Sequence, residues 1–171
     1  MGPRRVRWLG LGAVTAAVAA VVLFWFQPQK LLIDETVDDE LPATEAAPAS
    51  PTAAEPAELA ELASGTFVSL DHSTSGRVRV LRLADGTRIV RLEGLRTDNG
   101  PDLYLYLSRA PVDGAESSFD DDIVNLGRLK GNQGDQNYEL ASDVDLEPYT
   151  SVVIWCDRFN SAFGAAALVP A

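Results

Sequence analysis

The side chain of this chain that is best suited to chemical reactions is its single thiol, Cys156. It ends the apolar run Val152–Cys156. One cysteine cannot form an internal disulfide, so the thiol is a buried core group, half of an intermolecular bridge, a redox group or a cofactor ligand. Val152, Ile154 and Cys156 alternate along a predicted strand and share one face, which favours burial. The position at the strand end leaves room for exposure. The pattern is therefore compatible with two interpretations of Cys156, a core residue and a chemically active thiol.

The second candidate is His72, the only histidine in the sequence. A blue-copper site needs two imidazoles, covalent haem needs Cys-x-x-Cys-His, and zinc or iron–sulfur centres need more thiolates, so these centres are excluded. A non-covalent haem with Cys156 or His72 as axial ligand remains an option, as does a thiol that cycles through sulfenic acid or a mixed disulfide. The alternative for His72 is local hydrogen bonding in a turn over residues 72–76.

No catalytic motif accompanies these two residues, and the sequence assigns no enzymatic reaction. Asp120–Asp122 lacks the alternating spacing of a calcium loop and is predicted to be a solvated acidic loop. Gly100–Asp102 predicts a tight turn before a strand. The loop over residues 131–137 is rich in glycine and amides, and we predict a hairpin turn there, with a ligand-binding rim as the functional alternative.

The N-terminal region of the sequence predicts a membrane anchor. Residues 8–26 carry no charge and no proline, and as a helix they would be roughly 29 Å long, close to the thickness of a bilayer. Three arginines precede this run and acidic residues follow it, so residues 1–7 are predicted to be cytoplasmic and the rest extracytoplasmic. A cleaved signal is the rival interpretation, but its small-x-small motif, Ala17–Ala19, lies inside the apolar run. We therefore expect a single-pass protein of the cell membrane.

The next segment, residues 27–63, is rich in proline, alanine and acidic residues. It carries too little apolar mass to offset the entropy of ordering, so we predict a disordered stalk. The formal net charge of the chain is −11, and acids outnumber bases beyond the predicted anchor. This charge excludes nucleic acid and anionic lipid surfaces as partners of the extracytoplasmic region, although the anchor itself binds the bilayer.

Residues 64–171 are predicted to form one all-β domain. Leu103, Leu105 and Leu107 share one face of a strand, with Tyr104 and Tyr106 on the other. An Asp-Gly pair separates two alternating runs, which is the strongest short hairpin signal. Strands are expected at residues 66–70, 78–83, 87–92, 103–107, 123–126, 137–140, 151–156 and 162–168. Many short strands with polar turns indicate an antiparallel sandwich or a partly closed barrel.

Three motifs in this domain resemble the DM-thirteen family: Asn99–Tyr104, Leu126–Tyr138, and Val152–Cys156 followed by Phe163-Gly164. The family has been proposed to act in electron transfer, and it occurs beside haem- or sugar-binding DOMON domains. The resemblance implies that Cys156 is the position of interest. It also implies electron transfer or thiol redox together with a redox partner protein, in a domain that the predicted anchor places outside the cytoplasm. The alternative is a non-catalytic binding or adhesion module of the bacterial envelope.

Overall fold

The computed structural model describes residues 15–24, 34–42 and 59–171. The chain divides into two units, residues 1–33 and residues 34–171. In the first unit, residues 15–24 form a helix. Within the described regions of the chain, no helix has both the length and the apolar character that crossing a membrane requires. The rest of the predicted anchor, residues 8–14 and 25–26, lies outside the described residues.

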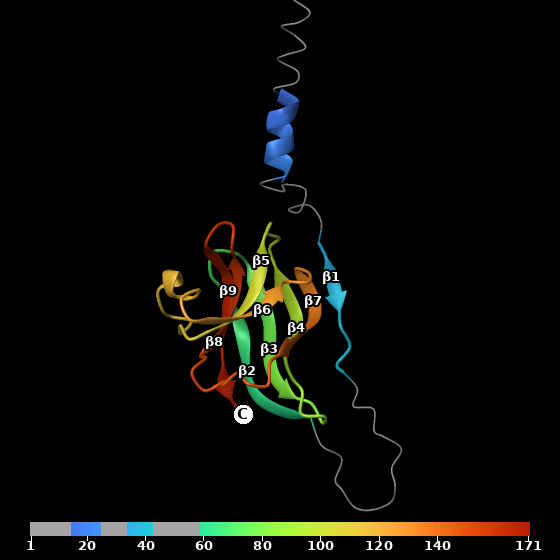
Figure 1. The fold of residues 1–171 in the computed structure, drawn as a ribbon, viewed down its shortest axis with the longest axis vertical. Coiled ribbons are helices and arrows are strands. Elements are labelled where there is room, and N and C mark those ends of the chain that lie inside the picture. Colours follow the sequence, from blue (N-terminus) through green and yellow to red (C-terminus); the bar gives the residue numbers. More distant parts are fainter. Residues whose placement is uncertain (1–14, 25–33, 43–58) are drawn as a thin grey trace, which may run out of the picture. The chain divides into compact units, whose positions relative to one another are not determined.

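In the described residues of the second unit, ten strands form one sheet and one short 3-10 helix is present (Figure 1). The strands are β1 (Thr36–Asp38), β2 (Ala60–Ser69), β3 (Thr74–Arg82), β4 (Arg88–Thr97), β5 (Leu103–Ser108), β6 (Ile123–Arg128), β7 (Gln133–Leu140), β8 (Ser151–Cys156), β9 (Ser161–Ala167) and β10 (Val169–Pro170), and the helix is η2 (Glu116–Ser118). The predicted strands are all present. The all-β expectation is confirmed.

The sheet has the strand order β1-β7-β4-β3-β2-β9-β8-β5-β6, and β10 pairs with β2. All neighbours are antiparallel except β1, which runs parallel to β7. The long strand β2 joins two halves, because its N-terminal portion pairs with β3 and its last residues, Phe67–Ser69, pair with β9. Register shifts in β2, β3 and β4 add bends to the strands. The sheet is therefore strongly curled and forms a half-barrel (Figure 1).

The predicted turns are correct in one case and misplaced in another. Between β3 and β4 the Asp-Gly hairpin forms as predicted: Leu83 N–H donates to the Thr87 carbonyl at 2.8 Å, and Gly86 has a φ of 88°. The turn predicted over residues 72–76 is shorter, because β3 begins at Thr74. Gly76, with a φ of 129°, lies in a bulge inside β3 rather than in the turn.

The predicted stalk is wrong at two places. Residues 36–38 form β1 on the edge of the domain, and β2 begins at Ala60, before the predicted domain boundary at residue 64. Composition indicated disorder because this segment buries little apolar surface. It is ordered instead by backbone pairing with β7 and by polar side chains, which a composition argument does not detect. Residues 27–33 and 43–58 of the predicted stalk lie outside the described residues.

Two apolar clusters hold the domain together. The larger one lies between the two halves of the curled sheet and includes side chains of β3, β4, β5, β8 and β9, among them Cys156. The smaller one covers the other face of β5, β8 and β9 and consists of Tyr106, Ala110, Phe119, Val153, Trp155, Ala162 and Ala165. Because both faces of β8 are covered, every residue of this strand is buried. The C-terminal half of the sheet is thus the most enclosed region of the described domain.

Candidate functional site

Cys156 ends β8, opposite Leu103 of β5 and Ser161 of β9. Its exposed fraction is 0%, and it belongs to the apolar cluster between the two halves of the sheet, together with Leu103 and Phe163. The structure therefore has Val152, Ile154 and Cys156 pointing inward, as their alternation predicts. The strand end gives the thiol no access to solvent, because its side chain is packed within this apolar cluster.

The surroundings of Cys156 favour the neutral thiol. Burial raises the pKa of this thiol, and backbone hydrogen bonds from Phe159 and Arg158 offset that rise only partially. Thiol–disulfide exchange requires a thiolate that a partner can reach. A thiol with a raised pKa and no exposed surface meets neither requirement. This argues against thiolate exchange by Cys156 in the native fold.

His72 lies in the turn between β2 and β3. Its Nδ1 is 3.2 Å from Asp98 Oδ2, and its ring stacks on Phe163 with the ring centres 3.7 Å apart. Its carbonyl oxygen accepts a hydrogen bond from Thr74 Oγ1. The ring and the backbone of His72 thus serve the local turn. Phe163 connects this turn to the cluster that contains Cys156, since it stacks on His72 and packs within that cluster.

The cavity described for this domain lies away from both candidate haem ligands. A haem needs space beside an accessible axial ligand. A cavity of about 430 Å³ is lined by Leu62, Ala63, Leu146, Glu147, Tyr149, Thr150, Leu168 and Pro170. It lies at the start of β8, whereas Cys156 ends that strand, and neither Cys156 nor His72 lines it. Among the described residues, no three side chains of the His, Cys, Asp and Glu types come together as a metal site.

A charged pair lies next to Cys156 at this end of the sheet. Asp102, which precedes β5, pairs with Arg128 at the end of β6, at 2.5 Å between Oδ1 and Nη2. The guanidinium of Arg128 also lies 5.2 Å from the centre of the Tyr104 ring. The tight turn predicted at Gly100 is packed against the core, because a Cβ there would collide with side-chain atoms of Leu103 and Phe163. The turn thus positions Asp102 between the core and Arg128.

On the opposite face of β5, a phenol meets a carboxylate. The Tyr106 hydroxyl donates to Asp157 Oδ1 at 3.0 Å, and Tyr106 is only 4% exposed. Burial raises the pKa of Tyr106, and the bond to Asp157 raises it further. The Tyr104 ring centre is 6.1 Å from that of Tyr106, and the buried Trp155 is the cross-strand partner of Tyr104. The alternation in β5 predicts the tyrosine face but not its partner Asp157. A signal for Asp157 does exist in the sequence, because it lies two residues after Trp155, which alternation places on the same face.

The amide-rich segment over residues 131–137, predicted to be a loop, binds β1 instead of forming a hairpin, and from Gln133 onward it belongs to β7. The predicted hairpin is wrong, because β6 and β7 lie at different ends of the strand order and the loop crosses between them. Asn132, only 4% exposed, accepts from Glu35 N–H at 2.7 Å and donates to Asp34 Oδ1 at 2.9 Å. Gln136 is fully buried and donates to the Gly131 carbonyl at 2.8 Å. The rim that was a candidate for ligand binding therefore holds a segment of the same chain.

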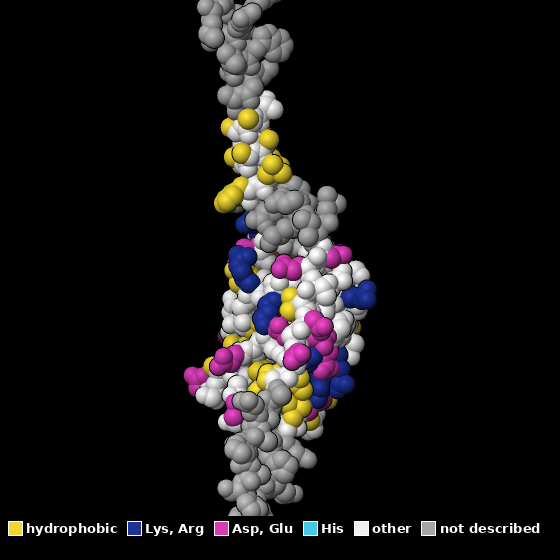
Figure 2. All heavy atoms as spheres, turned by 90° about the vertical axis from the view of Figure 1, so that its right-hand side faces the viewer, with side chains coloured by type: hydrophobic (Ala, Val, Ile, Leu, Met, Phe, Trp, Pro, Cys, Tyr) yellow, Lys and Arg dark blue, Asp and Glu magenta, His cyan; other side chains and the backbone are white. Residues whose placement is uncertain are grey.

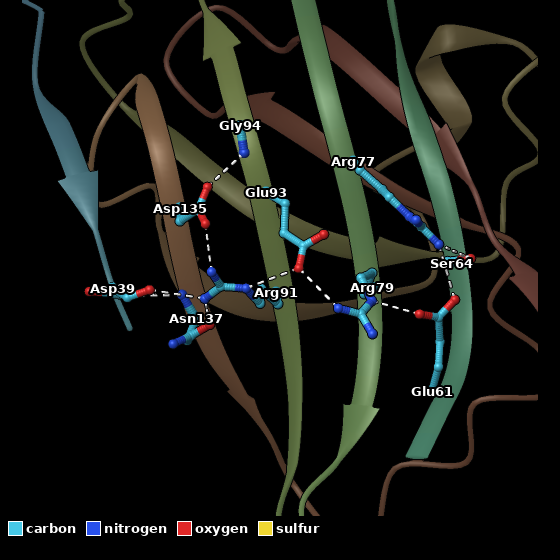
Figure 3. A network of polar contacts seen from close by, with 10 residues as sticks. All are labelled: Asp39, Glu61, Ser64, Arg77, Arg79, Arg91, Glu93, Gly94, Asp135 and Asn137. Atoms are coloured by element: carbon cyan, nitrogen blue, oxygen red, sulfur yellow. Dashed lines mark hydrogen bonds and ion pairs between the residues drawn. The ribbon is translucent and has the colours of Figure 1, made fainter. Parts of the chain in front are cut away.

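A network of charged residues continues from β1 across the sheet (Figure 3). The Arg91 side chain, 9% exposed, donates to the Asp39 carbonyl at 3.0 Å, to Asn137 Oδ1 at 2.8 Å and to Asp135 Oδ2 at 2.6 Å. It also pairs with Glu93, which in turn binds Arg79. Figure 2 shows acidic and basic side chains gathered together on this side of the domain.

Two carboxylates at the ends of this network are held in their ionised form. The pKa of Asp39 is lowered, chiefly by its hydrogen bond with Lys130, whose Nζ lies 2.6 Å away. The pKa of Glu61 is lowered by hydrogen bonds with Ser64 and with Arg79. Because the charged groups are paired with one another, the network is suited to stabilising the β1 edge and not to proton transfer.

The family model described as electron transfer DM13 matches residues 66–168, which is more than half of the chain. No curated protein and no solved structure matches the chain. The matched region begins within β2 and ends after β9, so it covers both halves of the curled sheet, Cys156 and the Tyr106–Asp157 pair. The chain therefore belongs to the DM13 family.

Proposed function

We propose that this chain is a membrane-anchored electron-transfer protein whose DM13 domain works outside the cytoplasm. The observation that carries the proposal is the match of the electron transfer DM13 model over residues 66–168. The anchor is supported by the uncharged run over residues 8–26, with arginines before it and acidic residues after it.

The proposed activity is one-electron transfer and not thiol–disulfide exchange. Cys156 has no exposed surface and its pKa is raised by burial, so a partner thiol cannot reach a thiolate there without opening the core. Electron transfer has no such requirement, because electrons cross a protein interior without contact between the reacting atoms. The enclosed half of the sheet supplies the buried oxidisable side chains Tyr106 and Trp155, and the partly buried Tyr104 packs against them. Its closed packing supports a role that needs no substrate pocket.

The test uses the full chain in detergent micelles. A flash-generated tris(bipyridine)ruthenium(III) complex removes one electron, and ascorbate returns it, while absorbance follows the protein radical. We expect repeated cycles without covalent loss in wild type and in Cys156→Ala. The same chain unfolded in denaturant is the control and should lose signal through radical coupling. If the folded chain is oxidised irreversibly, the electron-transfer proposal fails. If only Cys156→Ala fails to cycle, the thiol carries the reaction.

Membrane topology has its own test. Protease added to intact cells or spheroplasts should release a fragment close in mass to residues 34–171, the second unit of the structure. The full chain should remain in the membrane fraction before protease treatment. A fragment protected from protease, or a soluble species without it, contradicts the anchor.

A second candidate function, a binding module of the envelope, is favoured by the cavity at the start of β8. Most of its lining is apolar, with Leu62, Tyr149 and Leu168 among the lining residues. We expect a ligand there to be apolar. Binding of an anilinonaphthalene dye to the full chain in an amphipol, and its loss in Ala63→Trp, tests this function. Unchanged dye fluorescence in that variant contradicts it.

A further inference from the structure

We propose that Tyr106 is the residue that carries the electron hole in this domain and that Asp157 accepts its proton. This inference rests on the proposed electron-transfer function and names the side chains that perform it. Tyr106 is 4% exposed, and its hydroxyl donates to Asp157 Oδ1 at 3.0 Å. Asp157 is exposed, so a proton received there can pass to solvent. The pair thus combines a shielded phenol with a base in contact with water.

The reaction balances one electron and one proton. A one-electron oxidant, such as a ferric or cupric centre of a partner protein, removes an electron from the Tyr106 ring. The Tyr106 O–H bond breaks and the proton moves along the existing hydrogen bond to the Asp157 carboxylate. The products are a neutral tyrosyl radical, a protonated Asp157 and the reduced oxidant. A one-electron donor then reverses each change, and the O–H bond forms again.

The environment of the other tyrosines explains why the hole should reside on Tyr106. The chain has four tyrosines, and the structure describes all of them. Three have a cationic group over the ring: Arg128 lies 5.2 Å from the centre of Tyr104, Lys130 lies 5.4 Å from Tyr138 and Arg109 lies 5.6 Å from Tyr149. A cation at the ring face disfavours removal of an electron from that ring. Tyr106 is the one whose hydroxyl donates to a carboxylate in the described structure.

Two neighbours connect Tyr106 to the surface and to the core. The Tyr104 ring centre lies 6.1 Å away and the ring is half-buried, so it can pass an electron between a docked partner and Tyr106. Trp155 is 1% exposed and packs in the same cluster as Tyr106. The cation over Tyr104 makes that ring a transient carrier, while the carboxylate beside Tyr106 makes the phenol the place where the hole is held.

Tyr138 offers a matched control. It is buried to the same extent, 4% exposed, but its hydroxyl donates to the Gln136 amide oxygen at 2.7 Å. An amide cannot take the proton as a carboxylate does, so oxidation of Tyr138 lacks a base. The two residues are equally exposed and differ in the two features that the proposal invokes, the carboxylate base and the cation over the ring.

The experiment applies flash photo-oxidation by tris(bipyridine)ruthenium(III) to the full chain and records electron paramagnetic resonance spectra. Tyr106→Phe should remove the main tyrosyl signal, and Tyr138→Phe should leave it unchanged. Asp157→Asn keeps an oxygen that accepts the hydrogen bond but removes the base. It should slow formation of the radical by at least about tenfold, within the range for a lost general base. In Asp157→Asn, the kinetic isotope effect on radical formation in deuterated water should also disappear.

The outcomes separate this inference from the proposed function. If wild type cycles reversibly but the signal persists in Tyr106→Phe, or if Asp157→Asn has no effect on rate and isotope effect, the assignment to Tyr106 and Asp157 is overturned and electron transfer stands. If wild type does not cycle at all, the proposed function fails. Asp157 is exposed, so Asp157→Asn provides a well-folded variant even if Tyr106→Phe loosens the core.

Discussion

The carbonyl oxygen of Val37 occupies the space that a side chain on residue 134 would need, so β1 lies against β7 only because this position is Gly134. Gly131 has the same role at the start of the loop, where a Cβ would collide with the Glu35 carbonyl. Asn132 between them binds the backbone of Glu35. Two glycines and a buried amide thus form a specific binding surface for the parallel strand β1.

Replacing Gly134 with alanine should destabilise the domain more than replacing Gly127. Both glycines have positive φ, 93° and 115°, so alanine costs about 1–3 kcal/mol at either position. Only Gly134→Ala also displaces β1, since a Cβ at Gly127 meets open space. Thermal unfolding measures the loss of stability. Hydrogen exchange of the Thr36–Asp38 amides should become fast in Gly134→Ala alone, and equal exchange in both variants would refute the role of the close approach.

The β1 edge should weaken in acid. The pKa values of Asp39 and Glu61 are lowered in the folded domain, so each carboxylate stabilises the fold while it is ionised. That stabilisation is present above their unfolded pKa values and is lost as the pH falls below about 4. Denaturant unfolding at several pH values should show it. The double variant Asp39→Asn, Glu61→Gln should be less stable than wild type at neutral pH, and its free energy of unfolding should fall less on acidification. If the free energy of unfolding fell equally with pH in both proteins, the role of the network would be contradicted.

Cys156 should behave as a core residue. Cys156→Ser places a hydroxyl in an apolar cluster and should cost about 1–3 kcal/mol. Cys156→Ala removes only sulfur contacts and should cost roughly 1 kcal/mol. Maleimide labelling of the folded chain should be slow and should become fast in denaturant. Labelling of the native protein at the rate of a free cysteine would show that the thiol is reachable and would restore thiol chemistry as a candidate.

His72 should be replaceable by another ring. Its ring centre lies 3.7 Å from that of Phe163, and His72→Ala should lose about 0.5–1.5 kcal/mol of stability with this contact. His72→Phe keeps the stacking and should retain most of the stability and all of the electron transfer. A cofactor ligand would not tolerate this change. Loss of reversible oxidation in a folded His72→Phe protein would therefore assign the imidazole a chemical role.

The sequence predicts the strands of this domain well, because alternation and turn chemistry are local. Leu103, Leu105 and Leu107 point to the core as their spacing indicates, and the inward face of β8 was also predictable. The pairing of segments that are distant in the sequence could not be predicted in this way. The sequence of β1 carries little apolar mass, and what orders it lies almost a hundred residues later, in Asn132 and Asn137.

The candidate site shows the same division. The face of β8 on which Cys156 lies follows from the alternation in its own strand, whereas its full burial depends on how the strand end is packed. The Tyr106–Asp157 pair depends on the register between β5 and β8, which places Tyr106 opposite Val153 and brings Asp157 of the following turn within reach. A register that joins two strands is decided by tertiary packing, so no local pattern predicts this hydrogen bond.

The position of β2 in both halves of the sheet has a consequence for how the chain folds. β2 is among the first strands to be synthesised, yet it pairs at its C-terminal end with β9, which is among the last. Domains dominated by such distant pairings fold slowly, and strand edges without a partner are templates for aggregation. N-terminal segments emerge first during synthesis. The interval between the appearance of β2 and that of β9 is therefore when the chain most needs protection by a chaperone.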